Sequence, residues 1–450
     1  MALERRPWIE PLPTTAGEAL AVVGTLIGAG HRAYLVGGAV RDLLAGRTPG
    51  DWDVVTDARP DRLGDLFPGS RHVGAAFGVV LIQSGDKWIE TATFREEGRY
   101  LDGRHPQDIR FTDDPVRDAM RRDFTVNALL LDPINGEILD PVGGLRDAEA
   151  GLLRAVGRPD ERFAEDGLRL LRAARLAAQC SLDLEAETAA ALGRNAGMVD
   201  LLAPERIAGE LIRMVCGPTP SRAFDILRVS GILQRFLPEV AALYGVEQPS
   251  DHHPEGCVWT HTMMMLDAAE APPLELALGC LFHDVGKPAA RIVRDGVPRF
   301  PGHAPIGAKM ADAILTRLRF PNRVIGIVTS LVGRHMMFLE VTQMRPATLK
   351  RFLAHPLFPL QHELHRLDRL AGRGDLTTWE FCRDQLAEMP EEELHPLPLV
   401  SGRDLIRLGY PRGPLLGVIL MDLETAQLEG EIPDRDAALA WISAHHPRGR

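Results

Sequence analysis

The sequence is poor in cysteine, and the cysteines that it has are scattered. They form no Cys-x-x-Cys pair, and their number is odd, at positions 180, 216, 257, 280 and 382. This pattern favours reduced thiols and a cytoplasmic location. The sequence also lacks a run of about 18 apolar residues, the length that crosses a bilayer. Residues 1–30 do not follow the basic, apolar, small-residue order of a signal peptide, so we expect no membrane segment.

Lysine is scarce as well. Only four of the 51 basic residues are lysine and the others are arginine, while the formal net charge is −11. A negative balance argues against a protein that coats nucleic acid with its whole surface, so an RNA substrate would need a local basic patch. Arginine suits contacts with phosphates and base edges. A genome rich in arginine codons explains the same excess of arginine over lysine, so this excess alone does not indicate RNA binding.

A glycine pair and an aspartate pair lie close together near the N-terminus. An apolar strand runs into Gly37-Gly38 and a predicted helix, and Asp51 and Asp53 lie in the next predicted strand. Glycines let a backbone approach a phosphate, and the N–H groups at a helix start attract its charge. Side chains two apart in a strand point to one face. Paired carboxylates beside a phosphate cradle suit Mg²⁺ and phosphoryl transfer.

Four motifs in a fixed order resemble those of the class II tRNA nucleotidyltransferase and poly(A) polymerase family. They are Leu35-Val36-Gly37-Gly38-Ala39-Val40-Arg41-Asp42 with Asp51-x-Asp53, Arg121-Arg122-Asp123-Phe124-Thr125-Val126-Asn127-Ala128, Glu165-Asp166-Gly167-Leu168-Arg169-Leu170-Leu171-Arg172-Ala173-Ala174-Arg175, and His283-Asp284-Val285-Gly286-Lys287. The resemblance implies that Asp51 and Asp53 are catalytic and hold Mg²⁺. It also implies that Gly38 and Arg41 hold phosphate, and that Arg122 contacts the triphosphate or ribose, with Asp123 orienting it.

The same resemblance implies an α+β chain. We expect a nucleotidyltransferase head of the polymerase-β type with a small mixed sheet over residues 1–145 and an all-α, RNA-binding neck over 146–246. An HD-type metal-binding helical domain over 247–390 and a helical tail over 391–450 follow. Residues 247–256 are polar and contain proline, which makes them the best candidate domain boundary.

Two further segments of the head bear on its chemistry. Residues 79–82 and 88–92 predict a β-hairpin. Its second strand carries Glu90, a candidate third carboxylate if this strand adjoins the aspartate pair; a plain exposed glutamate is an equal alternative. Residues 93–111 are polar and glycine-punctuated and predict a mobile loop. In the family, such a loop is associated with the final A addition, which favours full CCA-adding or A-adding activity.

The helix predicted over residues 164–178 carries Asp166, Arg169 and Arg172 along one face, and Arg175 continues the row. An accepting carboxylate beside a donating guanidinium matches the Watson–Crick edges of cytosine and adenine, whereas guanine and uracil present the opposite order. We therefore predict that this helix selects CTP and ATP without a nucleic-acid template. A surface ladder of ion pairs is the alternative.

His283 and Asp284 follow an apolar stretch, so we expect them to be partly buried and to need a partner, which a metal supplies. The candidate ligands are His261, His283, Asp284 and Asp368, with His303 and His335 extending the set to a second ion. Such a mixed N/O set suits Ni²⁺, Mn²⁺ or Zn²⁺. It predicts phosphohydrolase activity, for instance on 2′,3′-cyclic phosphates, and a purely structural domain is the alternative.

We interpret the chain as a template-independent nucleotidyltransferase that builds the tRNA 3′-CCA end from CTP and ATP. A poly(A) polymerase or A-adding enzyme stays an alternative, although the basic signature expected after a poly(A) polymerase neck is missing. The intact aspartate pair disfavours both a phosphohydrolase whose head only grips RNA and a non-catalytic RNA-binding module. The sequence leaves open the oligomeric state and whether the chain adds all three nucleotides.

Overall fold

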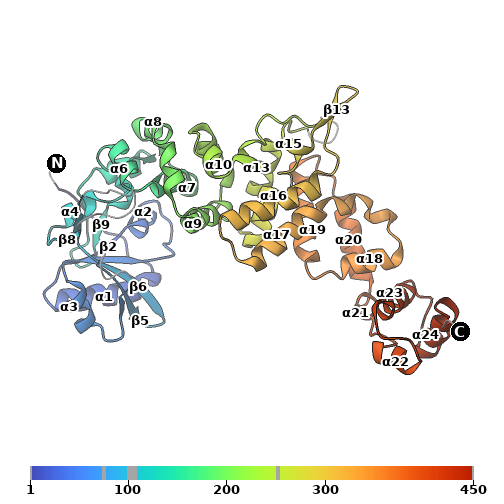
Figure 1. Cartoon of the computed structure of the whole chain (residues 1–450). Helices are drawn as coiled ribbons and strands as arrows, with labels where there is room; N and C mark the ends of the chain where they lie inside the picture. The colour runs from blue at the N-terminus through green and yellow to red at the C-terminus, as the bar shows by residue number, and fades with distance from the viewer. Residues whose placement is uncertain (1–2, 73–77, 99–108, 250–253, 448–450) are drawn as a thin grey trace. The chain divides into compact units, whose positions relative to one another are not determined.

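A computed structural model describes residues 3–72, 78–98, 109–249 and 254–447. The chain forms two compact units, Met1–Ala241 and Ala242–Arg450 (Figure 1). The division falls close to the predicted boundary segment, whose central residues 250–253 lie outside the described part. The finer division into four parts stays a prediction.

The first unit contains an eight-stranded sheet in the order β1-β10-β9-β2-β3-β6-β5-β4. Its strands are β1 (Glu4–Pro7), β2 (Ala33–Val36), β3 (Asp53–Thr56), β4 (Arg71–His72), β5 (Val79–Ser84), β6 (Lys87–Thr93), β9 (Leu130–Asp132) and β10 (Glu137–Asp140). Strands β3 and β6 are parallel and the other neighbours antiparallel, so the predicted mixed sheet is confirmed. The predicted hairpin is β5 and β6.

Each face of this sheet packs a separate cluster of buried side chains. One cluster includes Val23 of α1 together with Trp52 and Val54, and the other includes Val55 and Phe94. The helices of the head are α1 (Gly17–Gly28), α2 (Gly38–Leu44), α3 (Pro60–Leu66), α4 (Pro115–Met120) and α5 (Gly144–Glu149). The helical spacing of Leu20, Val23, Leu26 and Ile27 predicts a helix over residues 1 to about 30. This prediction is wrong at its start, where β1 and a 3-10 turn, η1 (Thr14–Ala16), precede α1.

The rest of the first unit is mainly helical, but the prediction that it is all-α is wrong at the short parallel pair β11 (Leu152–Leu153) and β12 (Asp183–Leu184). Its helices are α6 (Pro159–Glu165), α7 (Leu168–Gln179), α8 (Ala186–Arg194), η4 (Ala196–Leu201), α9 (Pro204–Val215), α10 (Pro220–Val229), α11 (Leu233–Phe236) and α12 (Pro238–Ala241). The prediction of one helix over 164–178 is wrong, because the chain breaks between α6 and α7. Asp166 is extended there (φ −148°), and a Cβ on Gly167 would lie 2.7 Å from the Met198 carbonyl oxygen.

Within its described residues, the second unit is built of helices apart from one short hairpin, β13 (Ile292–Arg294) with β14 (Val297–Arg299). Its helices are α13 (Val258–Ala268), α14 (Leu274–Phe282), α15 (Lys287–Ala290), α16 (His303–Arg317), α17 (Asn322–Arg334), η5 (His335–Gln343), α18 (Pro346–Leu353), α19 (Phe358–Ala371), α20 (Thr377–Glu388), α21 (Glu391–Leu394), α22 (Gly402–Arg407), α23 (Pro414–Leu428) and α24 (Arg435–His445). The last three helices enclose their own cluster, around Leu405, Ile419 and Ile442.

One apolar segment of the second unit has the length and composition of a membrane span. It is Asn322–Gln343, which comprises α17 and η5 and has a mean hydropathy of 1.5. Its side chains Val328, Leu331 and Val332 are fully buried within the unit. A core helix passes the same test, so the segment is weak evidence for a membrane.

Candidate active sites

The strand-to-helix turn after β2 depends on glycine. Gly37 has φ +76°, a conformation that disfavours other residues, and a Cβ there would lie 3.6 Å from the Asp53 carboxylate. A Cβ on Gly38, the first residue of α2, would lie 3.3 Å from Nη2 of Arg41. The turn therefore brings bare backbone close to both a carboxylate and a guanidinium.

Three carboxylates meet beside this turn. Strand β3 begins at Asp53. The prediction that Asp51 lies within the strand is therefore wrong, because Asp51 comes just before it. Trp52 is buried in the core on the other side, which leaves both aspartates on the opposite side. Strand β6 runs parallel to β3 with Val54 opposite Thr91, and this register puts Glu90 beside Asp53.

The electrostatics of this carboxylate group favour a cation. Burial, then the negative charge of Glu90, and to a smaller degree that of Asp51, raise the pKa of Asp53 to about 6, against a lowering by Arg122. A divalent cation relieves this repulsion, and oxygen ligands are those that Mg²⁺ prefers. The residues present therefore fit Mg²⁺, with Glu90 as a third carboxylate.

Two arginines of the predicted phosphate site lie at the edge of this group. Arg41 folds back on its own helix, pairing with Asp42 (Nη2–Oδ1 3.0 Å) and donating to Asn127 (2.7 Å). Arg122 pairs with Asp118 (3.1 Å). Its Nε has no hydrogen-bond partner among the described residues. A buried N–H without a partner is costly, so Arg122 retains a donor for a phosphate or ribose oxygen.

The row of charged residues on α6 and α7 is paired differently from the prediction. Asp166 binds Arg206 of α9 through both oxygens, at 3.0 and 2.7 Å. Arg169 instead binds Glu165 (2.5 Å) and the carbonyl oxygens of Arg162 and Arg121. The guanidinium beside the Asp166 carboxylate is therefore that of Arg206, and Arg169 links α7 to two neighbouring segments.

The two following arginines also have carboxylate partners. Arg172 binds Asp123 (2.6 and 2.8 Å). Asp123 thus orients Arg172 and not Arg122, contrary to the prediction. Burial by itself would raise the pKa of Asp123, but the charge and hydrogen bond of Arg172, with a hydrogen bond from Asn127 and the charge of Arg169, together hold it well below its usual value. Arg175 pairs with buried Glu210 (2.6 Å), which makes it a structural link between α7 and α9.

The second unit brings four imidazole rings together, and the same ring nitrogen of each faces a protein oxygen. Each ring has its Nδ1 against an oxygen: His261 against Glu255 (2.7 Å), and His283, His303 and His335 against the carbonyl oxygens of Cys280 (2.9 Å), Phe300 (2.9 Å) and Val332 (2.7 Å). A ring anchored at Nδ1 presents Nε2 as its free ligand atom. Metal-binding histidines are usually held in this way.

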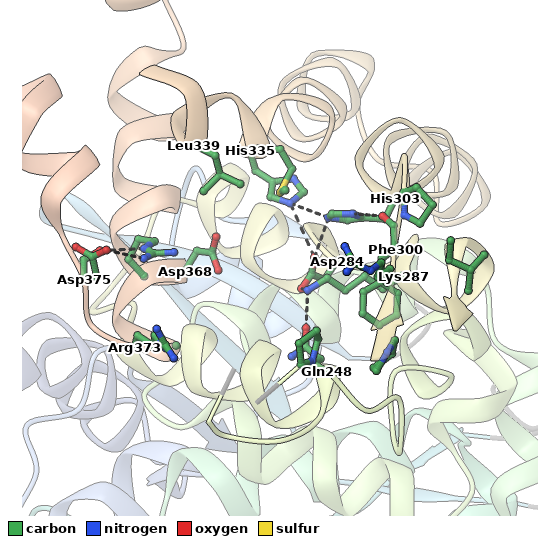
Figure 2. A pocket seen from close by; sticks show the side chains of 18 of the residues that line it. Gln248, Asp284, Lys287, Phe300, His303, His335, Leu339, Asp368, Arg373 and Asp375 are labelled. Carbon is green, nitrogen blue, oxygen red and sulfur yellow. Dashed lines mark hydrogen bonds and ion pairs between the residues drawn. The ribbon is translucent and has the colours of Figure 1, made fainter. Parts of the chain in front are cut away.

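The Nε2 atoms converge on two carboxylates. His261 lies 2.9 Å from Asp368, and His283 lies 3.1 Å from Oδ2 of Asp284. Oδ1 of Asp284 faces His303 at 3.3 Å and His335 at 3.9 Å (Figure 2). Asp284 therefore stands between two ligand groups, one with His261, His283 and Asp368, the other with His303 and His335.

These groups fit a transition metal. His303 and His335 bring their Nε2 atoms within 3.2 Å of each other, a close approach of two ligand atoms that a shared cation stabilises. Burial, then the charge of His283, lowers the pKa of His335 to about 4, which keeps this ligand neutral. Burial would also lower the pKa of His261, but hydrogen bonds to Asp368 and Glu255 raise it to about 9. A bound cation would take the place of the proton that Asp368 and Glu255 hold on His261.

Comparison with known proteins decides the family. Family models match the poly A polymerase head domain at residues 33–154, the probable RNA- and SrmB-binding site of polymerase A at 181–244, and the HD domain at 251–372. The "Multifunctional CCA protein" of Halorhodospira halophila is 36% identical over 429 residues, covering 90% of this chain and 98% of that protein. The chain belongs to the tRNA nucleotidyltransferase family.

Other members of the tRNA nucleotidyltransferase family support the assignment. The "CC-adding tRNA nucleotidyltransferase" of Thermus thermophilus is 36% identical and covers 91% of this chain and 93% of its own length. A Bacillus stearothermophilus CCA-adding enzyme solved with CTP matches with a TM-score of 0.73 and 25% identity, over 96% of this chain and 98% of that chain. A Thermotoga maritima CCA-adding enzyme solved with tRNA shares the fold, with a TM-score of 0.60 at 18% identity. The predicted family, fold class and enzyme class are confirmed.

Sequence reasoning missed residues that complete both sites of this nucleotidyltransferase. Asp118 and Arg206 lie within or near stretches that were identified, but only the fold reveals that they pair with Arg122 and Asp166. Glu255 lies in the segment taken as a linker, and nothing in the sequence indicates that it holds His261. Lys287 ends the His-Asp motif and lies 2.6 Å from Asp284.

Proposed function

We propose that the chain adds CCA to the 3′ end of tRNA from CTP and ATP, without a nucleic-acid template. The observation that carries this is the group of three carboxylates beside the Gly37-Gly38 turn. The charge of Arg122 acts on this group, and its Nε has no partner among the described residues. In each step the 3′-hydroxyl oxygen of the RNA bonds to the α-phosphorus, and the bond to pyrophosphate breaks. Asp51 and Asp53 would hold Mg²⁺, which stabilises the charge on the reacting and leaving oxygens.

The chain's own residues have separate roles in this proposal. Backbone N–H groups at the start of α2 and the Arg41 guanidinium bind phosphate oxygens. Arg122 contacts the triphosphate or ribose. The carboxylate of Asp166, with an adjacent guanidinium, receives the base edge and admits cytosine and adenine.

The test uses tRNA that lacks its CCA end, with CTP and ATP supplied separately and together. CTP alone should add two residues, and ATP should then add one. Asp51→Ala or Asp53→Ala should abolish both additions and leave tRNA binding nearly unchanged. Incorporation at a near wild-type rate in either variant would remove the carboxylates from the mechanism, and repeated A addition would instead identify a poly(A) polymerase.

Full addition and partial addition remain to be distinguished, since relatives with CCA-adding and CC-adding names both match over most of the chain. We favour full CCA addition because the segment between β6 and α4 is long. Its ends form a ladder, β7 (Arg95–Glu97) with β8 (Ile109–Phe111), and the centre of the predicted loop lies outside the described residues. Deleting that centre should spare C addition and impair A addition; equal loss of both would make it part of the scaffold.

A second function is carried by the four anchored imidazoles. We propose that the second unit binds a transition metal, Ni²⁺, Mn²⁺ or Zn²⁺, through His261, His283, Asp284 and Asp368, with His303 and His335 holding a second ion. Such an ion, when bound, would polarise a phosphoester and lower the pKa of a bound water molecule. The reaction would open the 2′,3′-cyclic phosphate of damaged RNA, clearing an end that the head cannot extend.

The two functions should be separable by substitution. Replacing both His283 and Asp284 by alanine should abolish metal-dependent hydrolysis of cyclic phosphates and leave CCA addition largely intact. If the wild-type protein binds none of these metals, the unit has a structural role only. We infer a cytoplasmic location from the substrate and from the five scattered cysteines, a pattern that favours reduced thiols.

A further inference from the structure

A pocket of about 900 Å³ lies against the histidine–aspartate group of the second unit (Figure 2). Asp284, His303, His335 and Asp368 line one part of it. Most of its other lining residues come from the β13–β14 hairpin and the residues just after it, from η5, and from the end of α19 with the segment that follows. Gln248, Pro249, Lys287 and Thr378 complete the lining. This volume exceeds what a single phosphate group needs, so the pocket has room for more of the ligand than the reacting ester.

Some of the charges that line the pocket are already neutralised. Lys287 lies 2.6 Å from Asp284 and donates to Gln248. Arg369 pairs with Asp375 at 3.1 Å. The remaining acidic side chain, Asp368, belongs to the candidate metal ligands. These residues therefore add little net charge to the walls.

Three other arginines of the pocket, unlike Arg369 and Lys287, have no carboxylate partner among the described residues. Arg294, Arg299 and Arg373 line it and are exposed. None of them makes an ion pair or hydrogen bond with another described residue. Exposed guanidinium groups that line one pocket, and that have no carboxylate partner among the described residues, favour the binding of anions there.

The β13–β14 hairpin and the segment after α19 carry these arginines on two sides of the pocket. Arg299 pairs with Ile292 across the hairpin, and Arg294 is two residues from Ile292. Arg294 and Arg299 therefore share one face of the hairpin. Arg373 lies on the side of Asp368, away from Phe300 at the end of the hairpin (Figure 2). A ligand at the metal-ligand group thus has cationic neighbours in two directions.

We propose that Arg294, Arg299 and Arg373 form a subsite for a second phosphate, so that the pocket selects nucleotides phosphorylated on both sides of the ribose. This rests on the hydrolase function proposed above. The ligand is a 2′,3′-cyclic phosphate that also carries a 5′-phosphate, either a mononucleotide or the last residue of an RNA strand. Water adds to phosphorus, one ribose–phosphate bond breaks, the freed ribose oxygen takes a proton, and the 5′-phosphate stays unchanged.

The test compares adenosine 2′,3′-cyclic phosphate with the same ester bearing a 5′-phosphate, in the full chain loaded with Mn²⁺ or Ni²⁺. The 5′-phosphate should raise kcat/KM on the order of 10-fold, as expected for partly exposed charge-assisted hydrogen bonds. Replacing Arg294 and Arg299 by alanine should abolish this preference through KM and leave hydrolysis of the simple ester unchanged. Arg291→Ala is the matched control, because Arg291 is exposed, adjoins the hairpin and does not line the pocket.

A binding measurement without metal gives an independent result. The measurement is titration calorimetry with EDTA present and the head saturated with CTP. The protein should bind adenosine 3′,5′-bisphosphate more tightly than adenosine 3′-phosphate. The difference should shrink with salt and vanish in the arginine variant.

Three outcomes separate the possibilities. Equal hydrolysis of both esters, unchanged by the arginine substitutions, overturns the subsite and leaves the hydrolase standing. Absence of all hydrolysis refutes the hydrolase, and the metal-free binding comparison then decides the subsite alone. A dinucleotide ending in a cyclic phosphate identifies an RNA end as the ligand if it is cleaved faster than the phosphorylated mononucleotide.

Discussion

Replacing Gly286 by alanine tests how the second unit assembles its histidine group. Gly286 precedes α15 and has φ −80° and ψ −13°, which alanine adopts without strain. A Cβ there would lie 2.2 Å from the His303 carbonyl oxygen and 2.6 Å from the Gly307 nitrogen. Both atoms are backbone, so neither moves away by a change of rotamer. The start of α16 must shift, and His303 must shift with it.

The expected cost follows from this overlap. Overpacking costs typically 1–3 kcal/mol, and a clash with rigid backbone belongs near the upper limit. In a unit of this size, about 3 kcal/mol lowers the melting temperature by roughly 6–12 °C. Differential scanning calorimetry should detect this, and mass spectrometry of the metal-loaded protein should detect fewer bound ions. CCA addition should remain, since the head lies in the other unit.

Gly326→Ala is the control for this substitution. Gly326 lies inside α17 with nothing within 4 Å of its added Cβ. Alanine in an open helical position stabilises by about 0.5–1 kcal/mol. The two substitutions should therefore shift the melting temperature in opposite directions. If Gly286→Ala leaves both the melting temperature and the bound metal unchanged, the packing argument for His303 is refuted.

Three further predictions concern the first unit. Glu210→Gln should destabilise by about 3–5 kcal/mol in chemical denaturation, because it leaves the buried Arg175 charge without its partner. Asp123→Asn should lower nucleotide addition on the order of 10- to 100-fold by releasing Arg172, at about 1.5–3 kcal/mol for a charge-assisted bond. In metal-free protein the raised pKa of Asp53 makes a contribution to the free energy of unfolding that depends on pH. This contribution is fully present below about pH 4 and is lost as the pH rises through about 6. Mg²⁺ should therefore raise the melting temperature more at pH 7.5 than at pH 5.

The parts of the head that sequence could predict are those that local patterns determine. The apolar Trp52 between two aspartates predicts a buried indole with the carboxylates on the other side, and this holds although Asp51 lies just before β3. Gly37-Gly38 likewise indicates a turn that few other residues permit. The role of Glu90 could not be decided, because it depends on the parallel pairing of β3 with β6, a contact between segments distant in sequence.

The α6–α7 region shows why the predictions of one helix over 164–178 and of the partners of its charged side chains failed. A spacing of three among Asp166, Arg169 and Arg172 predicts one helical face, yet the spacing carries no information on Met198, whose backbone packs against Gly167 and breaks the helix. The partners of the charged side chains come from distant segments for the same reason. Asp123 binds Arg172, and no local pattern distinguishes this pair from one with the neighbouring Arg122.

The pairing of Asp166 yields a prediction about base selection. Arg206 donates to both oxygens of Asp166, while Arg169 is 9% exposed and bound to Glu165 and two carbonyl oxygens. If the Asp166 carboxylate accepts a hydrogen bond from the base while it stays paired with Arg206, then Arg206 supplies or positions the hydrogen-bond donor to the base. Arg206→Ala should then reduce discrimination against UTP and GTP as much as Asp166→Ala does.

A double-mutant cycle separates this from the alternative in which Arg169 donates. The variant lacking both Asp166 and Arg206 should be little worse than either single variant, with a coupling of about 0.5–3 kcal/mol in the ratio of kcat/KM for CTP and UTP. Arg169→Ala should chiefly lower stability, since its bonds tie α7 to the Arg121 segment. The result that contradicts the reasoning is specific: selectivity intact in Arg206→Ala but lost in an Arg169→Ala protein that melts at the wild-type temperature. The donor would then be Arg169, and the Asp166–Arg206 pair would be a link between helices that opens when the nucleotide binds.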